Sequence, residues 1–467
     1  MYLHRTLLEP TSVQGAVFSA EHGLVVSRRD RILVAETSVR VQGRIAAFAL
    51  LHGSLICCLE DGEVLNLLLD DLVGQHTVNN GQNKRKTATA NNGNVHNANH
   101  APQRVPECGP LVATCQKHSI AALYPTIGLL KFIMPFKKEF CTSIDTIDVM
   151  SIAFIHNEKY ARLAILYQET SKDSRLIRLL DVNYTNKTAD CVFQKDRRVD
   201  AAALFIVPVS PLAGGGVLVI GEARIELISA DKFESTQNTA AINISPTIIK
   251  THCEVNPVLH LLTDFRGKVF ILKIATKLSL HEIFVSDSSD PAPITIASCS
   301  VWMGNGRVYL GSHYSDSQFI YIEGLSHIPT AFAVNEKVID FETSSLDYKV
   351  TQNITNIAPM TSFCSVPIEG GRYGQTQLLG CTGAFHTGAI TIIRNGVEIL
   401  PTLSLQLGIC HDIWTFNGGL LAGYYMGYTR VFSNAANEFR EISDSGFQTT
   451  QNTITCADIT KDYIVQV

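Results

Sequence analysis

The chain has 467 residues, of which 46% are hydrophobic and 17% are charged, and its formal net charge is −5. The length suffices for about two or three ordinary domains, and the low share of charged residues is typical of a chain with much interior. The negative balance argues against a general binder of phosphate backbones, which needs a strongly basic surface, although it does not exclude a local basic patch.

Cysteine usage and the absence of long apolar runs bear on the compartment. The 12 cysteines lie within short apolar runs, and none shows the Cys-x-x-Cys spacing of a metal site. We therefore expect reduced core thiols in a reducing compartment. The first residues lack the apolar stretch of a signal peptide, and no run reaches the about 18–20 residues of a membrane span. The sequence predicts a soluble protein of the nucleus or cytoplasm, without membrane contact, metal or cofactor.

The first clear pattern lies between Arg44 and Asp71, where three apolar runs are separated by His52-Gly53 and Asp61-Gly62. Glycine readily adopts the positive φ that a two-residue hairpin turn requires, and Asp-Gly is a strong hairpin signal. The pattern predicts a meander of three strands joined by two tight turns.

The stretch from Gly74 to Glu107 interrupts this pattern. It is dense in Asn, Thr, Ala and Gly and almost free of large apolar side chains. Such a segment cannot bury enough apolar surface to offset the entropy of ordering it, so we predict a disordered loop over residues 74–107. We interpret its Lys84-Arg85-Lys86 triplet as a solvated charge cluster, with nuclear import or nucleic-acid contact as the alternative.

Strands and turns alternate along the rest of the chain. Turns are predicted at Gly214–Gly216, Arg266-Gly267 and Asn305-Gly306, between apolar runs without convincing helical periodicity. The sequence therefore predicts an all-β fold. A two-layer sandwich needs only about seven to nine strands, far fewer than this chain supplies. Hairpin groups recur roughly every 40–50 residues, the spacing of propeller blades, and blades stacked around an axis bury both faces of each meander.

Blade spacing also predicts the domain organisation. Residues 1–352 provide for about seven blades, so we predict one closed, seven-bladed β-propeller there. Residues 353–467 suffice for about two or three further blades, which cannot close a ring. The last residues, "CADITKDYIVQV", alternate without a following turn. We therefore expect the first blades of a second, incomplete propeller over residues 353–467, in a fragment of a longer polypeptide.

No catalytic constellation emerges from the sequence. The Gly-rich stretch "AGGGVLVIG" lacks the Lys-Ser/Thr of a phosphate-binding loop, and it is interpreted as a β-turn. The acidic pairs Asp61/Glu63 and Asp70/Asp71 are interpreted as turn residues. Isolated histidines such as His260 are interpreted as satisfied core or turn residues. An enzyme would need several His, Asp or Glu side chains converging at the propeller axis, so we expect a protein that is not an enzyme.

Several stretches resemble one family. Residues 311–318, "GSHYSDSQ", and 383–396, "GAFHTGAITIIRNG", are similar to the large triple-propeller proteins that serve DNA-damage binding, pre-mRNA splicing and 3′-end processing. Further similar stretches, in family order, are "GLLKFIMPF", "AGGGVLVIGEARI", "SPTIIK", "RGKVFILKI", "NIAPMTSF" and "GYTRVFS". The "IRNG" at residues 393–396 favours the damage-binding branch.

The resemblance implies a non-enzymatic adaptor that links a type-4 cullin ubiquitin ligase to substrate-receptor propeller proteins. It further implies a role in the DNA damage response and a nuclear location, with nucleic-acid contact indirect or weak. In that family the second propeller docks the cullin, and the first and third together grip a receptor helix. The alternative is a splicing or 3′-end-processing subunit that binds protein or RNA partners.

The resemblance also implies site residues. It places His313, Tyr314 and Pro359 on the receptor-facing side. The damage-binding branch carries a basic residue where His313 stands, and usually Gly at Ser315. Histidine is mostly neutral near pH 7, so a charge-assisted contact there would be weaker. The alternative interpretation is that Tyr314 and Gln318 end a strand and pack on the next blade.

Overall fold

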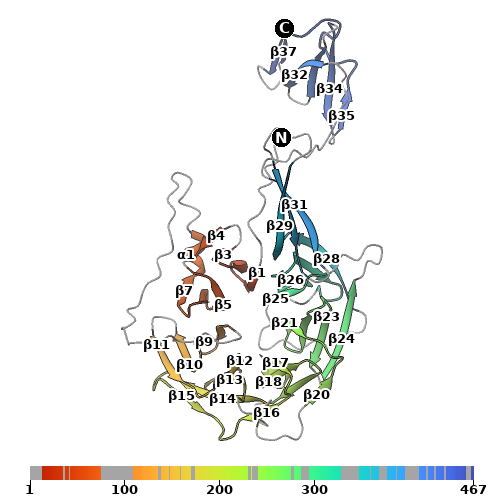
Figure 1. The fold of residues 1–467 in the computed structure, drawn as a ribbon. Coiled ribbons are helices and arrows are strands. Elements are labelled where there is room, and N and C mark those ends of the chain that lie inside the picture. Colours follow the sequence, from red (N-terminus) through yellow and green to blue (C-terminus); the bar gives the residue numbers. More distant parts are fainter. Residues whose placement is uncertain are drawn as a thin grey trace. The chain divides into compact units, whose positions relative to one another are not determined.

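A computed structural model gives the fold of the chain (Figure 1). It describes residues 13–34, 37–41, 43–74, 109–134, 138–146, 148–157, 159–169, 174–229, 233, 240–274, 278–285, 294–326, 328, 346–357, 359–367, 376–384, 387–394, 410–416, 419–424, 427–435, 438–458 and 464–467. The chain divides into two compact units, of which the larger spans residues 8–394 and the smaller includes residues 395–467.

Within the described residues between positions 13 and 354, seven antiparallel meanders follow one another along the chain. The first three consist of β1 (Val13–Ser19), β2 (Gly23–Arg28), β3 (Arg31–Val34) and β4 (Thr37–Arg40); β5 (Ile45–Leu51), β6 (Ser54–Leu59) and β7 (Val64–Leu68); and β8 (Leu111–Cys115), β9 (Ile120–Thr126), β10 (Leu129–Met134) and β11 (Lys138–Ser143). The fourth and fifth consist of β12 (Asp148–Ile155), β13 (Ala161–Gln168), β14 (Arg175–Asn183), β15 (Thr188–Cys191) and β16 (Arg197–Val199); and β17 (Ala203–Pro208), β18 (Val217–Gly221), β19 (Arg224–Ile228) and β20 (Ala240–Asn243). The last two consist of β21 (Ile249–Asn256), β22 (Leu259–Asp264), β23 (Val269–Ile274) and β24 (Leu278–Val285); and β25 (Ala297–Gly304), β26 (Arg307–Ser312), β27 (Ser317–Ile322) and β28 (Asp347–Ile354).

Tight turns join the strands where the sequence predicts them. His52 and Gly53 have φ values of 44° and 74°, and Asn305 and Gly306 have values of 53° and 78°. Positive φ at both central residues is the requirement of the two-residue turn that matches the twist of a hairpin. The sequence therefore sets the hairpin ends locally, through residues that tolerate the left-handed region.

Each central meander is buried on both faces, which explains the nearly continuous apolar runs. In β13, Leu163 and Ile165 belong to a cluster shared with the third meander, whereas Ala164 and Leu166 belong to a cluster shared with the fifth. Because successive side chains of a strand point to opposite faces, one strand packs against both neighbours.

The ring closes between the last meander and the first. Each pair of consecutive meanders shares an apolar cluster, and a further cluster joins Val301 and Tyr309 to Val13 and Val26. The Ser298 hydroxyl also donates to the Val13 carbonyl at 2.8 Å. The meanders thus surround a common axis, as Figure 1 shows for the larger unit. The predicted all-β propeller architecture is confirmed, and the number of blades in the whole chain stays a prediction.

The sixth and seventh meanders are additionally joined at their outer strands. Phe284 and Val285 of β24 pair in parallel with Asp347 and Tyr348 of β28. This pairing merges the two meanders into one eight-stranded sheet. It removes two outer strand edges that would otherwise be open to other chains.

Two predictions concern the segment that begins near residue 70. The prediction that Asp70 and Asp71 are turn residues is wrong, because both lie in the short helix α1 (Leu69–Gly74) that follows β7. The apolar Leu69 and Leu72 of this helix join the cluster of the first two meanders, so packing favours the helical turn. The predicted disordered loop over residues 74–107 lies outside the described residues except for Gly74, which ends α1.

The remaining strands form three small sheets. The one in the larger unit consists of β29 (Met360–Pro367), β30 (Thr376–Thr382) and β31 (Ala389–Ile393). In the smaller unit they are β32 (Cys410–Phe416), β33 (Gly419–Tyr424), β34 (Thr429–Ala435) and β35 (Glu438–Glu441), with the pair β36 (Cys456–Asp458) and β37 (Ile464–Gln466). The domain boundary between residues 352 and 353 and the second, incomplete propeller stay predictions. Across the described ranges, no helix is long and apolar enough to span a bilayer.

Candidate partner-binding site

The loop between β26 and β27 is built around the hydroxyl of Ser312. This buried hydroxyl donates to the Ile296 carbonyl at 2.8 Å. It accepts the backbone N–H groups of Tyr314 and Ser315 at 3.2 and 3.0 Å. A serine that bonds the backbone two and three residues further on fixes a turn in place of a strand ladder. The loop therefore has a defined backbone path.

A second set of polar contacts ties the loop to the start of the seventh meander. The Ser315 hydroxyl lies 2.5 Å from that of Thr295 and 3.0 Å from that of Ser312. The Gln318 side chain accepts the Thr295 N–H at 2.9 Å and donates to the Asn353 side chain at 3.0 Å. Buried polar groups that are mutually hydrogen-bonded rigidify their surroundings. The sequence reasoning missed this network, in which Ser315 makes contacts that the expected glycine lacks.

Asn356 connects this loop to the segment that precedes β29. Its backbone N–H donates to the Asp316 carboxylate at 2.8 Å, and its side-chain amide donates to the Ser315 carbonyl at 3.1 Å. The residue is buried. Pro359, which is half-buried, lies three residues further along this anchored segment. Asn356 thereby ties the predicted loop to the segment that leads to Pro359.

His313 and Tyr314 lie exposed at the tip of this polar framework. Tyr314 is 38% exposed, and the two rings meet edge to face with their centroids 5.2 Å apart. Gln318, by contrast, is buried and bonds to Thr295 and Asn353 within its own meander. Partner contact and packing on the next blade both stay predictions for Tyr314. The loop therefore presents two adjacent rings on a hydrogen-bonded base, a surface suited to contact with another protein.

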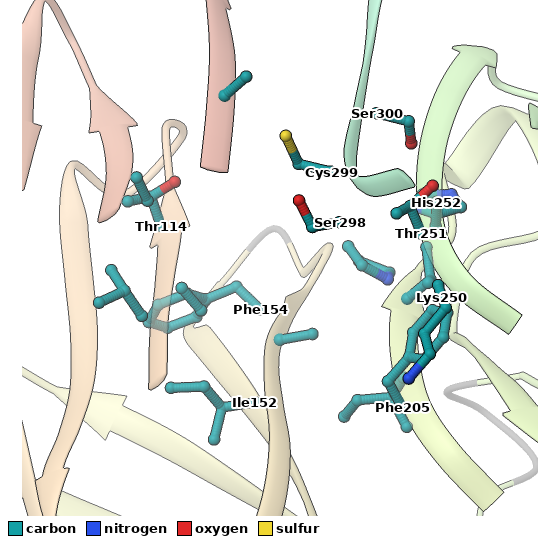
Figure 2. A pocket seen from close by; sticks show the side chains of 18 residues that line it. Thr114, Ile152, Phe154, Phe205, Lys250, Thr251, His252, Ser298, Cys299 and Ser300 are labelled. Carbon is teal, nitrogen blue, oxygen red and sulfur yellow. The ribbon is translucent and has the colours of Figure 1, made fainter. Parts of the chain in front are cut away.

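The axis of the ring contains a cavity of about 510 Å³ (Figure 2). Its described lining includes His252 and Lys250 but no aspartate or glutamate. The converging acid and base groups that an axial active site would need are therefore not present among these lining residues. No group of three or more potential metal-ligating side chains occurs within the described ranges either.

These features define the class of protein: a β-propeller with a preformed polar loop on its surface. The chain belongs to the RSE1/DDB1/CPSF1 first beta-propeller family, whose sequence model matches residues 121–360. The family expected from the sequence is therefore confirmed.

Three relatives of the chain are DNA damage-binding proteins by name. The chain is 27% identical over 361 residues to DNA damage-binding protein 1b of Arabidopsis thaliana, an alignment that covers 73% of the chain and 30% of that protein. It is 27% identical over 360 residues to DNA damage-binding protein 1 of Solanum lycopersicum, again covering 73% and 30%. It is 25% identical over 399 residues to DNA damage-binding protein 1 of Drosophila melanogaster, covering 81% and 32%. The chain thus spans about 30% of the length of these relatives.

Proposed function

We propose that the protein is a non-enzymatic adaptor that links a type-4 cullin ubiquitin ligase to substrate-receptor propeller proteins in the response to DNA damage. The names of the three relatives support a role in DNA damage over one in splicing or 3′-end processing, because each is called a DNA damage-binding protein. The nucleus is the corresponding location, with the cytoplasm as a second one.

The observation that carries the proposal is the preformed loop with His313 and Tyr314 at its tip. A loop whose backbone is already fixed by Ser312 and Asn356 loses little conformational entropy when a partner binds. Tyrosine offers a large, rigid contact area and is enriched among the residues that dominate binding energy. We assign this loop, together with the Pro359 segment, to the receptor-facing surface.

The other partners follow from the same proposal. The cullin binds through a second propeller that begins within residues 353–467. Nucleic acid is contacted indirectly or weakly, because the net charge of −5 does not supply the basic surface that phosphate backbones require.

A capture experiment with a matched control tests the proposal. The tagged full-length gene product is expressed in cells, and the co-purifying proteins are identified and quantified. We expect propeller-type receptors with the wild type and about tenfold less with Tyr314→Ala, since truncating an interface tyrosine costs on the order of 1–2 kcal/mol. Tyr184→Ala is the control, because Tyr184 is 51% exposed on the fourth meander, far along the chain from this loop.

Two results would contradict the proposal. One is recovery of neither a cullin nor any propeller-type receptor. The other is co-purification of small nuclear RNA or of RNA with a polyadenylation signal, which would support the RNA-processing alternative. Equal recovery by both tyrosine variants would remove Tyr314 from the receptor-facing surface.

A further inference from the structure

All seven meanders contribute their first strand to the axial cavity. Its lining comes from β1, β5, β8, β12, β17, β21 and β25. The volume of about 510 Å³ lies within the roughly 300–1,000 Å³ typical of sites for small molecules. The cavity is therefore large enough for a small organic ligand.

The two sides of the cavity differ in chemistry. Ile152 and Phe154 of β12 present aliphatic and aromatic surface on one side, and Lys250 and His252 of β21 lie on the other, as Figure 2 shows. Ser298 also lines the cavity, but its hydroxyl proton is directed to backbone carbonyls, including that of Val13. The groups left to meet a ligand therefore include apolar surface at Ile152, Phe154 and Phe205, the nitrogen groups of Lys250 and His252, and the Ser300 hydroxyl, which has no hydrogen-bond partner among the described residues.

The electrostatic character of the cavity comes from one side chain. Lys250 is the only charged residue in the lining and forms no ion pair with any described residue. Burial raises the pKa of the Cys299 thiol to about 12, so the thiol is neutral at physiological pH. Lys250 is itself exposed, and no carboxylate is among the described lining residues, so the one charge of the lining favours an anion.

A buried histidine pair determines which nitrogen of His252 carries a proton. His252 Nε2 lies 2.8 Å from Nδ1 of the fully buried His260, whose own Nε2 has no hydrogen-bond partner within the described ranges. Burial lowers the pKa of both rings, so both are neutral and each has one N–H.

The unpartnered Nε2 of His260 distinguishes between the two possible tautomers of the histidine pair. An unpartnered buried N–H is rarer in proteins than an under-satisfied acceptor, so His260 carries its proton on Nδ1 and donates it to His252 Nε2. The proton of His252 is consequently on Nδ1. His252 thus has an N–H donor on Nδ1, and it lies on the same strand as Lys250.

We propose that the axial cavity binds a small aromatic acid, that is, a flat ring carrying a carboxylate or a phosphate. The anionic group binds at Lys250 and His252, and the ring packs against Ile152 and Phe154. Aromatic rings gain from packing on other rings, and an anion gains from a charge-assisted bond to an ammonium. This ligand site is separate from the Tyr314 loop and does not depend on the proposed adaptor function.

Four probes, which carry the ring, the anion or both, test the proposal on the full chain by isothermal titration calorimetry. Phenyl phosphate and benzoate carry both the ring and the anion, phenol carries the ring alone, and inorganic phosphate carries the anion alone. We expect both aromatic acids to bind, and phenol and inorganic phosphate to bind at least about tenfold more weakly. The relative affinity of the two acids shows whether the anion is a carboxylate or a phosphate.

Three variants locate the site. Lys250→Gln is expected to weaken both aromatic acids about tenfold, because one charge-assisted bond is lost. Lys195→Gln is the control, since Lys195 is an exposed lysine outside the cavity, and it leaves binding unchanged. Ala49→Phe inserts a ring from β5 into the cavity and abolishes binding. The proposal is overturned if no aromatic acid binds at about 10 mM, if phenol binds as tightly as phenyl phosphate, or if Lys250→Gln binds like the wild type.

Discussion

Replacing Asn356 with alanine tests the framework that holds the partner-binding loop. The side-chain amide of this buried residue donates to the Ser315 carbonyl at 3.1 Å and to the Ser312 carbonyl at 3.4 Å. The longer bond is weak, so the main loss is one good hydrogen bond and the partner it leaves unsatisfied. That loss costs about 1–3 kcal/mol, and we expect Asn356→Ala to lower the free energy of unfolding by about 2 kcal/mol.

The assay combines stability with local hydrogen exchange. In a unit of this size, a loss of about 2 kcal/mol lowers the unfolding midpoint by roughly 3 °C. The amides of Tyr314 and Ser315 should also exchange faster, because their acceptor Ser312 belongs to the same framework. Gln352→Ala is the control, since Gln352 is exposed on β28 and outside the hydrogen-bonded network.

One result would refute this reasoning. If Asn356→Ala unfolds at the same temperature as Gln352→Ala, and the amides of the loop exchange as in the wild type, then the amide of Asn356 does not hold the loop. The order of the loop would then rest on Ser312 and its partners alone, and Asn356 would drop out of the receptor-binding proposal.

Two further predictions concern the ring and its buried histidines. Gly311→Ala places a Cβ 2.5 Å from Cys299 Sγ and 2.7 Å from Val13 Cγ1. We therefore expect this variant to lower the stability of the propeller by about 1–3 kcal/mol, measured by chemical denaturation. Unchanged stability would contradict the packing of the first meander on the last. Burial lowers the pKa of His260 from 6.5 to about 4. Between about pH 7 and pH 4 the unfolded chain therefore binds more protons than the folded chain. The free energy of unfolding should fall by up to roughly 3 kcal/mol as the pH drops through this range. His260→Leu should reduce this pH dependence and leave the part that is due to His252, whose pKa burial also lowers; an unaltered slope would show that other groups cause it.

Sequence patterns predict the features that depend on neighbours along the chain. The turns at His52-Gly53 and Asn305-Gly306 follow from the tolerance of those residues for positive φ. The continuous apolar runs predict strands buried on both faces, as β13 shows. The helical turn at Asp70 and Asp71 was not predicted, because it depends on how Leu69 and Leu72 pack against the cluster of the first two meanders.

The candidate sites were less accessible to sequence reasoning. Tyr314 and Gln318 lie in one polar stretch, yet the first is exposed and the second buried, because only Gln318 meets Thr295 of the adjoining segment. The axial cavity is lined by both Lys250 and Phe154, which lie almost a hundred positions apart in the chain. Such contacts depend on the order of the meanders around the axis, which no local pattern encodes.

Native-state hydrogen exchange of the inner strands tests most directly whether the meanders form a closed ring. In the closed ring, β1 is covered by the seventh meander through Val13, Val301 and Tyr309. The meander of β13 packs against the third and fifth meanders whether the ring is open or closed, so β13 is the reference. We predict that the hydrogen-bonded amides of β1 and β25 are protected from exchange to a similar degree as those of β13. Rapid exchange of β1 and β25 beside a protected β13 would show an open array of meanders and would contradict the account.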